Sequence, residues 1–290
     1  MTPPLVLTVG SLHYDIMIEA AHLPARDETA VGSRWYPKFG GKGGNQAVSV
    51  RRQGAASRMA GAVGDDDFGR FLRAGLRQAG VDDRFVVTLQ GCGSGMSVAI
   101  QDGAGDYAAT IVSGANLAID PTVMQDDALW DGVSVLVLQN EVPDAVNLSA
   151  ATQARRRGVR TILNAAPTRP LPEGLPALID VLVVNALEAG MMGAGSVRSL
   201  QDAAMAAGVL ATRFRAVVVT AGALGLAAQG GDVRLLLPAE RIAVVSSHGA
   251  GDAFVGALAT ALARGQDLPD ACRAGSTAAA LHVAGHFQTT

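Results

Sequence analysis

The chain has 290 residues, of which 49% are apolar and 17% are charged, and its formal net charge is −3. These values indicate a folded protein with a large core and exclude a mainly disordered chain. The small acidic charge disfavours nucleic acid as a partner, and no apolar run approaches the roughly 20 residues of a membrane helix.

The first residues and the cysteines bear on localisation. No basic segment precedes the apolar run Leu5–Val9, which is too short for a signal peptide. Cys92 and Cys272 are far apart in the sequence and have neither metal-ligand spacing nor a disulfide pattern. We therefore expect a cytoplasmic protein in a reducing setting, bound to neither nucleic acid nor membrane.

Short β-branched runs alternate with helical patterns along most of the chain. Buried strands are predicted at 5–9, 133–138, 160–163, 180–184, 216–219 and 242–245. Helices are predicted at 66–79, 144–157, 196–212, 250–264 and 269–283, with another one after Phe39–Gln46. This alternation predicts a single α/β domain over residues 1–290, with a mostly parallel, Rossmann-like sheet covered by helices on both faces.

Two regions interrupt this alternation. Extended segments are predicted at 15–19 and 34–39, and a hairpin is predicted from 96–101 and 107–112 around the turn 102–106. No helices are available to cover these strands. We therefore expect a small β-sheet lid formed by about residues 12–39 and 94–112.

The glycine-rich segment Phe39–Gln46 is the first candidate site. Its glycines allow close backbone approach and positive φ, and Lys42 and Asn45 supply donors for hydroxyl groups. It is not a phosphate-binding Walker loop, because no Ser or Thr follows the Gly-Lys pair. Taken alone, the segment is equally typical of a plain turn with a solvated lysine.

A second glycine-rich segment, Ser246–Asp252, opens the helix predicted from Ala250. Backbone amides at a helix N-terminus favour an anion. Asp252 in the first turn can accept a proton from an attacking hydroxyl. The simpler interpretation is that Asp252 only stabilises the helix start.

Two further segments follow buried strands. Asn185 and Glu188 share a helical face, which suits a hydrated Mg²⁺, but a capping box is a strong and simpler interpretation of the pair alone. The segment Thr220–Gly225 suits a nucleotide phosphate or equally a glycine-rich hairpin turn.

Together these segments resemble the ribokinase, or PfkB-type carbohydrate kinase, family. The matching stretches, in family order, are Gly10–Asp15, Gly40–Gln46, Gly114–Asn116, Glu141, Asn185–Glu188, Thr220–Gly225 and Gly249–Asp252. Gly40–Gln46 is close to the Gly-Gly-Lys-Gly-x-Asn-Gln signature of the ribokinase branch. The match covers nearly the whole chain and outweighs the simpler interpretation of each segment.

The resemblance implies transfer of the ATP γ-phosphoryl group to a primary hydroxyl, with Mg²⁺ bridging the phosphates. It implies Asp252 as the base and the amides of Gly249, Ala250 and Gly251 as an anion hole. It places the acceptor against His13, Asp15, Gly41, Lys42, Gly43, Asn45 and Glu141. It places the nucleotide against Asn185, Glu188, Thr220, Gly222, Gly225 and Ser276, with Glu188 acting indirectly on Mg²⁺. It also implies a homodimer through the lid.

Three departures from the family pattern modify these expectations. Ser246-Ser247 stands where the family has Asp-Thr, whose Asp helps to hold an activating K⁺. A neutral Ser246 binds a monovalent cation less strongly, so we expect weak or absent K⁺ activation.

His13 replaces an acceptor-contacting Asn. The chain also ends soon after the helix near Val283, so we expect an adenine side that is open or completed by a partner subunit.

The expected acceptor is ribose or a ribose-like molecule. His13, with Trp35 and Tyr36 as lid aromatics able to cover a base, favours a nucleoside or pseudouridine kinase as the alternative. A non-catalytic sugar- or nucleotide-binding protein is the alternative from another class. The retained Asp252 and Lys42 argue against it.

Overall fold

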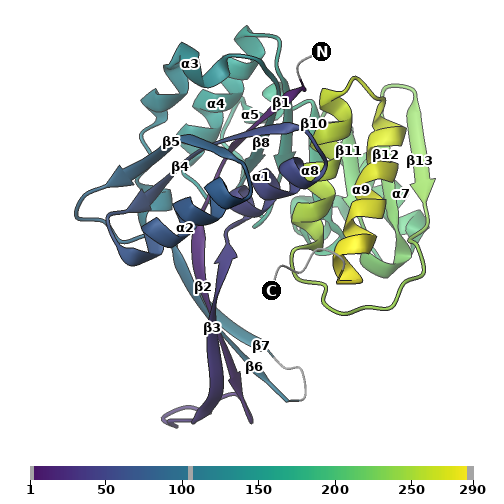
Figure 1. Cartoon of the computed structure of the whole chain (residues 1–290). Coiled ribbons are helices and arrows are strands. Elements are labelled where there is room, and N and C mark those ends of the chain that lie inside the picture. The colour runs from purple at the N-terminus through teal and green to yellow at the C-terminus, as the bar shows by residue number, and fades with distance from the viewer. Residues whose placement is uncertain (1–2, 104–106, 286–290) are drawn as a thin grey trace.

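The computed structural model describes residues 3–103 and 107–285 (Figure 1). Its main body is built on a nine-stranded sheet. From edge to edge, this sheet contains β13 (Val233–Leu237), β12 (Leu226–Gly230), β11 (Val217–Thr220), β10 (Val181–Asn185), β9 (Arg160–Asn164), β8 (Val133–Gln139), β1 (Leu5–Val9), β4 (Ala56–Gly64) and β5 (Asp82–Leu89). The strands from β11 to β5 are parallel, and β12 and β13 extend the sheet as antiparallel strands.

Helices cover both faces of this sheet, as the alternating pattern predicts. One face packs against α1 (Lys42–Arg52), α2 (Asp67–Gln78), α8 (Ala250–Ala263) and α9 (Leu268–Val283). The other packs against α3 (Asp127–Trp130), α4 (Asp144–Arg156), α5 (Leu175–Leu178) and α7 (Leu200–Leu210). In β8, Val135 and Val137 face the first group and Leu136 and Leu138 face the second. The sequences of such strands are continuous apolar runs, because both faces of the strand are buried.

Short helical turns complete the chain. They are η1 (Gly114–Leu117), η2 (Pro121–Gln125), α6 (Ala186–Ala189), the π-helical η3 (Gly190–Ala194) and η4 (Gly222–Leu224). The helix predicted from Ser196 begins later, at Leu200, because the Ser199 side chain accepts the Asp202 backbone N–H and caps it.

One predicted strand is wrong. Residues 242–245 form neither a strand nor a helix, and Val244 is 70% exposed. The segment pairs with no strand of the sheet. Instead, the backbone N–H of Val245 donates to the carbonyl of Val283 at 2.8 Å. β-branched residues favour a strand only where a sheet edge is available to pair with them.

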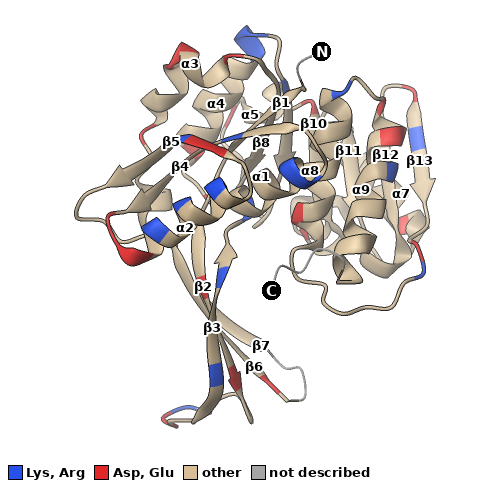
Figure 2. Cartoon of the chain, in the orientation of Figure 1, with Lys and Arg blue, Asp and Glu red and all other residues tan. Residues whose placement is uncertain are grey.

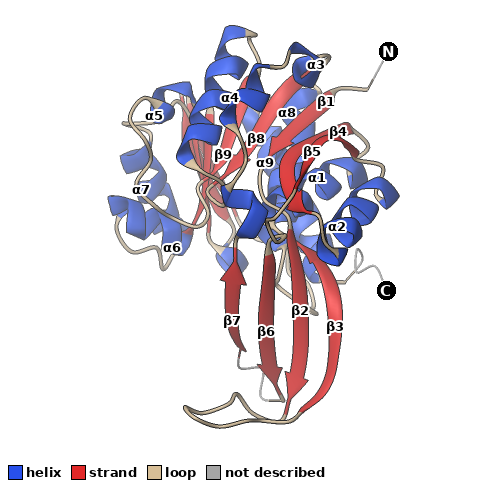
Figure 3. Cartoon of the chain, turned by 90° about the vertical axis from the view of Figure 1, so that its left-hand side faces the viewer, coloured by secondary structure: helices blue, strands red, loops and turns tan. Residues whose placement is uncertain are grey.

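A second, four-stranded sheet projects from the body and confirms the prediction of a small β sheet (Figure 3). Its order is β3 (Gly32–Gly40), β2 (His13–Ala20), β6 (Met96–Asp102) and β7 (Tyr107–Val112). β6 and β7 are antiparallel, as the predicted hairpin requires. Residues 104–106 of its turn lie outside the described part of the chain.

Charged residues are scattered over both sheets and the helices (Figure 2). Three arginines of α2, Arg70, Arg73 and Arg77, form ion pairs with nearby aspartates. Among the described residues, no helix is both long and apolar enough to span a bilayer.

Candidate active site

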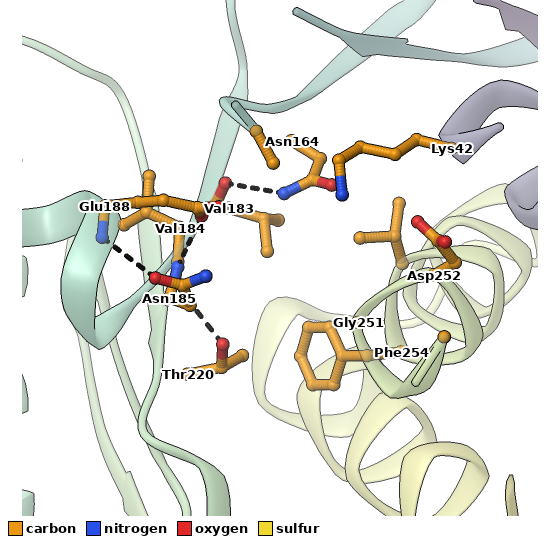
Figure 4. Close-up of a pocket in the computed structure, with 13 residues that line it drawn as sticks. Lys42, Asn164, Val183, Val184, Asn185, Glu188, Thr220, Gly251, Asp252 and Phe254 are labelled. Carbon is orange, nitrogen blue, oxygen red and sulfur yellow. Dashed lines mark hydrogen bonds between the residues drawn. The ribbon is translucent and has the colours of Figure 1, made fainter. Parts of the chain in front are cut away.

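A cavity of about 200 Å³ lies at the carboxyl ends of β9, β10 and β11, against the N-terminus of α8. Its polar lining comes from Lys42, Asn164, Asn185, Glu188, Thr220 and Asp252 (Figure 4). Ligands of open α/β sheets bind at this edge, where the loops after parallel strands converge. The structure thus brings together residues that are 210 positions apart in the sequence.

The glycine-rich segment places the N-terminus of α1 beside this cavity. Gly41 precedes the helix with φ 86°, and a Cβ there would lie 2.7 Å from the backbone N of His13. A Cβ on Gly43 would lie 2.6 Å from the backbone N of Ser11. These glycines therefore allow α1 to pack directly on the backbone that leads into β2.

Glu141 caps this helix. Its Oε2 accepts the backbone N–H of Lys42 at 3.0 Å and the hydroxyl of Ser11. A carboxylate is stabilised at a helix N-terminus by the free N–H groups and the helix dipole. Glu141 therefore lies beside the glycine-rich segment, where it is hydrogen-bonded to the Lys42 backbone.

Asp252 occupies the first turn of α8 and is only 8% exposed. Its Oδ2 accepts from Asn45 Nδ2 at 3.1 Å, and its Oδ1 accepts from Gln46 Nε2 at 2.9 Å. Burial raises the pKa of this carboxyl, and the Lys42 charge and these two hydrogen bonds oppose that rise. A buried carboxylate at a helix N-terminus, facing a cavity, is well placed to accept a proton.

A buried amide network lies behind Asp252 and was not among the predicted site residues. Gln46 Nε2 also donates to Asn164 Oδ1 at 3.1 Å, and Gln139 Nε2 donates to Gln46 Oε1 at 2.7 Å. Gln46 itself is fully buried. Its position four residues after Lys42, on the same helical face, is the sequence signal for this role.

The projecting sheet contributes Asp15, whose Oδ1 accepts the hydroxyl of Ser97. Burial raises the pKa of Asp15, while the Ser97 hydrogen bond and the charges of His13 and Lys38 lower it. Burial lowers the pKa of Lys38, which faces Asp15 across β2 and β3. His13 is 4% exposed, and its Nε2 has no partner among the described residues.

The β2–β3 register does not favour Trp35, one of the two lid aromatics able to cover a base, as a neighbour of Asp15. In the β2–β3 register, Trp35 pairs with Ile18, whereas Tyr36 lies two residues from Lys38 on the face that carries Asp15. Successive side chains of a strand alternate between its faces. Trp35 is therefore on the opposite face from Asp15, where Phe39 packs against α2, and it is 64% exposed.

Asn185 and Glu188 lie across the cavity from Asp252 and form the capping box that was the simpler interpretation (Figure 4). Asn185 Oδ1 accepts the Glu188 N–H, and Glu188 Oε2 accepts the Asn185 N–H, both at 2.8 Å. The Glu188 side chain keeps one oxygen outside this box. Burial raises its pKa, the Lys42 charge lowers it, and Asp252 raises it.

The other predicted nucleotide residues have different surroundings. Thr220 lines the cavity, but Gly222 and Gly225 lie in the hairpin between β11 and β12. Gly225 has φ 111°, and a Cβ there would lie 2.8 Å from Pro238 Cα, so it is required by the close approach of the chain after β13. Ser246 precedes the α8 turn, and Ser276 is half-buried in α9. Neither serine lines the cavity.

The donor set of the cavity fits a metal that is held mainly by a bound ligand. No group of three or more His, Cys, Asp or Glu side chains with metal-binding geometry occurs among the described residues. Mg²⁺ typically keeps several waters and binds through one or two carboxylates together with substrate phosphates. Of the carboxylates that line the cavity, Glu188 could hold such a metal through its water shell, and the N-terminus of α8 could hold a phosphate.

Known proteins resemble the chain along nearly its full length. The family model of pfkB family carbohydrate kinases matches residues 4–288. A ribokinase of Mus musculus is 34% identical over 263 residues, covering 89% of this chain and 81% of that protein. A ribokinase of Haemophilus influenzae is 30% identical over 280 residues, covering 96% and 92% of the two chains.

A solved structure agrees with these matches. The Arabidopsis thaliana ribokinase complexed with ribose and ATP superposes with a TM-score of 0.89 at 30% identity, covering 98% of this chain and 93% of that one. The predicted fold class and family are thereby confirmed. The chain belongs to the pfkB family of carbohydrate kinases, enzymes that phosphorylate a sugar at the expense of ATP.

Proposed function

We propose that this protein transfers the γ-phosphoryl group of ATP to the primary hydroxyl of ribose or a ribose-like small molecule. The observation that carries this proposal is the buried Asp252 carboxylate at the start of α8. It faces the cavity and is held by Asn45 and Gln46 from the glycine-rich helix α1. The ribokinase relatives, one of them complexed with ribose and ATP, support ribose as the acceptor.

In the proposed reaction, Asp252 accepts the proton of the acceptor hydroxyl. The hydroxyl oxygen forms the new bond to the γ-phosphorus, and the bond from that phosphorus to the bridging oxygen breaks and leaves ADP. The amides of Gly249, Ala250 and Gly251 donate to the phosphoryl oxygens as charge redistributes. Positioning and electrostatics provide most of the acceleration, because phosphoryl transfer needs little covalent chemistry from the protein.

The acceptor side combines α1 with the projecting sheet. Asn45 and Glu141 are tied to Asp252 and to the Lys42 backbone, so they frame one end of the acceptor. Asp15 enters from β2 and is oriented by Ser97. We assign acceptor binding to His13, Asp15, Gly41, Lys42, Gly43, Asn45 and Glu141.

The nucleotide side is formed by Asn185, Glu188 and Thr220 at the ends of β10 and β11. Mg²⁺, when bound with ATP, would neutralise the phosphate charge. Glu188 would hold it indirectly, through water, with the carboxylate oxygen that lies outside the capping box. Gly222 and Gly225 shape the hairpin beside the nucleotide, and Ser276 stands on its adenine side.

We further propose a homodimer through the lid. The β3 and β7 strands are the edges of the projecting sheet, and Ile111 and Val112 of β7 are exposed apolar residues. An unpaired edge with apolar side chains favours pairing with a second chain. Light scattering coupled to gel filtration should give twice the 29.5 kDa chain mass, and a monomer at high concentration would refute the proposal.

The activity is tested by ADP release from Mg·ATP with one acceptor at a time. D-Ribose is expected to give the highest kcat/KM among pentoses, hexoses, uridine, pseudouridine, cytidine, inosine and adenosine. A nucleoside that exceeds ribose would identify a nucleoside kinase and a changed acceptor pocket around His13. Ligand binding without ADP release from any acceptor would instead support a non-catalytic binding protein.

Potassium is expected to have little or no effect on turnover. Ser246 is neutral, and its Oγ accepts the backbone N–H of His248 at 3.4 Å. A hydroxyl attracts a monovalent cation less strongly than a carboxylate does. Rates in KCl and NaCl at equal ionic strength should agree, and Ser246→Asp should become faster in KCl. A clear K⁺ activation of the unmodified protein would contradict this expectation.

A further inference from the structure

The segment from residue 238 to residue 249, between β13 and α8, ends at the turn that carries the anion hole. Apart from that turn it has neither helix nor strand, and Val244 and Val245 are exposed. Its backbone N–H groups reach the end of α9: Val245 N–H and Ser246 N–H donate to the Val283 carbonyl at 2.8 and 3.3 Å. The end of α9 is therefore the surface that holds this segment in place.

The adjacent residue on α9, His282, contacts the turn itself. Its Nε2 lies 2.8 Å from the carbonyl oxygen of His248. A carbonyl only accepts hydrogen bonds, so Nε2 must carry the proton and donate it. The ring also lies against Gly249, where a Cβ would be 3.0 Å from Nε2 and 3.4 Å from Cε1. The imidazole thus fixes the turn both by a hydrogen bond and by contact.

This bond acts directly on the first donor of the anion hole. The His248 carbonyl and the Gly249 N–H belong to one planar trans peptide group and point in opposite directions. A donor on the carbonyl side therefore fixes the direction of the N–H on the other side. It also polarises the peptide, which makes that N–H a stronger donor.

We propose that His282 is a positioning residue that orients the Gly249 amide toward the transferring phosphoryl group. This inference rests on the proposed phosphoryl transfer. Because preorganised donors act mainly on the charge of the transition state, the contribution of His282 should fall on kcat and leave the KM of the acceptor unchanged. A purely structural tie would affect stability instead.

Three variants separate these roles. His282→Ala removes the donor, and His282→Gln supplies an amide donor of similar reach. Thr277→Val is the matched control, because it removes another bond between α9 and the same segment, from Thr277 Oγ1 to Glu240 Oε1 at 2.8 Å, near the end of the segment that follows β13. We expect His282→Ala to lower kcat about tenfold, as for loss of one neutral hydrogen bond that aligns a donor. The acceptor KM should stay within about twofold.

Recovery of most of the kcat in His282→Gln, with Thr277→Val close to the unmodified protein, is the expected pattern. Equal kcat in His282→Ala and the unmodified protein would overturn the inference, as would equal losses in His282→Ala and Thr277→Val. If the unmodified protein phosphorylates no acceptor, that result refutes the proposed function and not the hold of His282 on the turn.

Hydrogen exchange of the free protein gives a readout that needs no turnover. Peptides covering residues 246–254 should exchange faster in His282→Ala, recover in His282→Gln, and remain unchanged in Thr277→Val. Exchange that is unchanged in His282→Ala would show that His282 does not hold the turn, whatever the activity measurements give.

Discussion

Replacement of Asp252 by Asn is expected to lower kcat by about 10²- to 10⁴-fold, the usual contribution of a positioned general base. Asparagine keeps the size of the side chain and one oxygen that accepts from Gln46, but it cannot take the hydroxyl proton. Acceptor and ATP binding should remain, and isothermal titration together with single-turnover phosphorylation would measure the two effects separately.

The stability of this variant distinguishes loss of the base from loss of the fold. Burial raises the pKa of Asp252 above its unfolded value, so the ionised carboxylate is less favourable in the folded state. The ionised carboxylate therefore costs no stability at a pH below the pKa that Asp252 has in the unfolded chain. The full cost is present at a pH above the pKa that it has in the folded protein. At neutral pH, Asp252→Asn should therefore melt at the same or a higher temperature than the unmodified protein. Inactivity with a large drop in Tm would point to misfolding, and retained turnover would remove Asp252 from the mechanism.

Five of the nine strands of the main sheet, β1 and β8 to β11, could be predicted because they are apolar runs buried on both faces. Strands β4, β5, β12 and β13 were missed, and β4 is the hardest case. Its sequence, Ala-Ser-Arg-Met-Ala-Gly-Ala-Val-Gly, contains one β-branched residue. It lies in the sheet because its small side chains pack between β1 and β5, where Ala60 and Ala62 are fully buried. Tertiary packing outweighs local propensity at this position.

In the candidate site, too, some residues could be predicted from local sequence and others only from the folded structure. Asp252, Lys42 and Asn45 could be found from motifs, because each lies at a glycine-rich helix start. Asn164 could not, because it is simply the last residue of an ordinary strand, and only the sheet order places it beside Gln46. The faces of Trp35 and Tyr36 in the lid could not be predicted, because the register of β2 with β3 is set by pairing that no local pattern reveals.

The second large effect is expected at Gln46, the buried amide that joins Asp252 to the interior. Gln46→Leu removes the donor to Asp252 Oδ1 and the acceptor of the Gln139 amide. Each buried polar group left without a partner costs about 1–3 kcal/mol. Tm should therefore fall by more than about 4 °C. The remaining carboxylate also loses one of its two side-chain donors, so the pKa of Asp252 should rise further.

A higher pKa of Asp252 moves the pH profile of turnover in a known direction. The base works only when it is ionised, so turnover is lost as pH falls through the pKa of Asp252, and the acid limb of kcat/KM moves to higher pH in Gln46→Leu. Gln46→Glu is the more stringent test of this pKa. The glutamate has the shape of the glutamine and still accepts from the Gln139 amide, but it places a second carboxylate against Asp252. Like charges at this distance disfavour ionisation, so Gln46→Glu should shift the acid limb further than Gln46→Leu. Its buried carboxyl next to Asp252 should lower Tm at least as much as the leucine does. Identical pH profiles in both variants and the unmodified protein would mean that the amide holds the fold together without setting the protonation of the base.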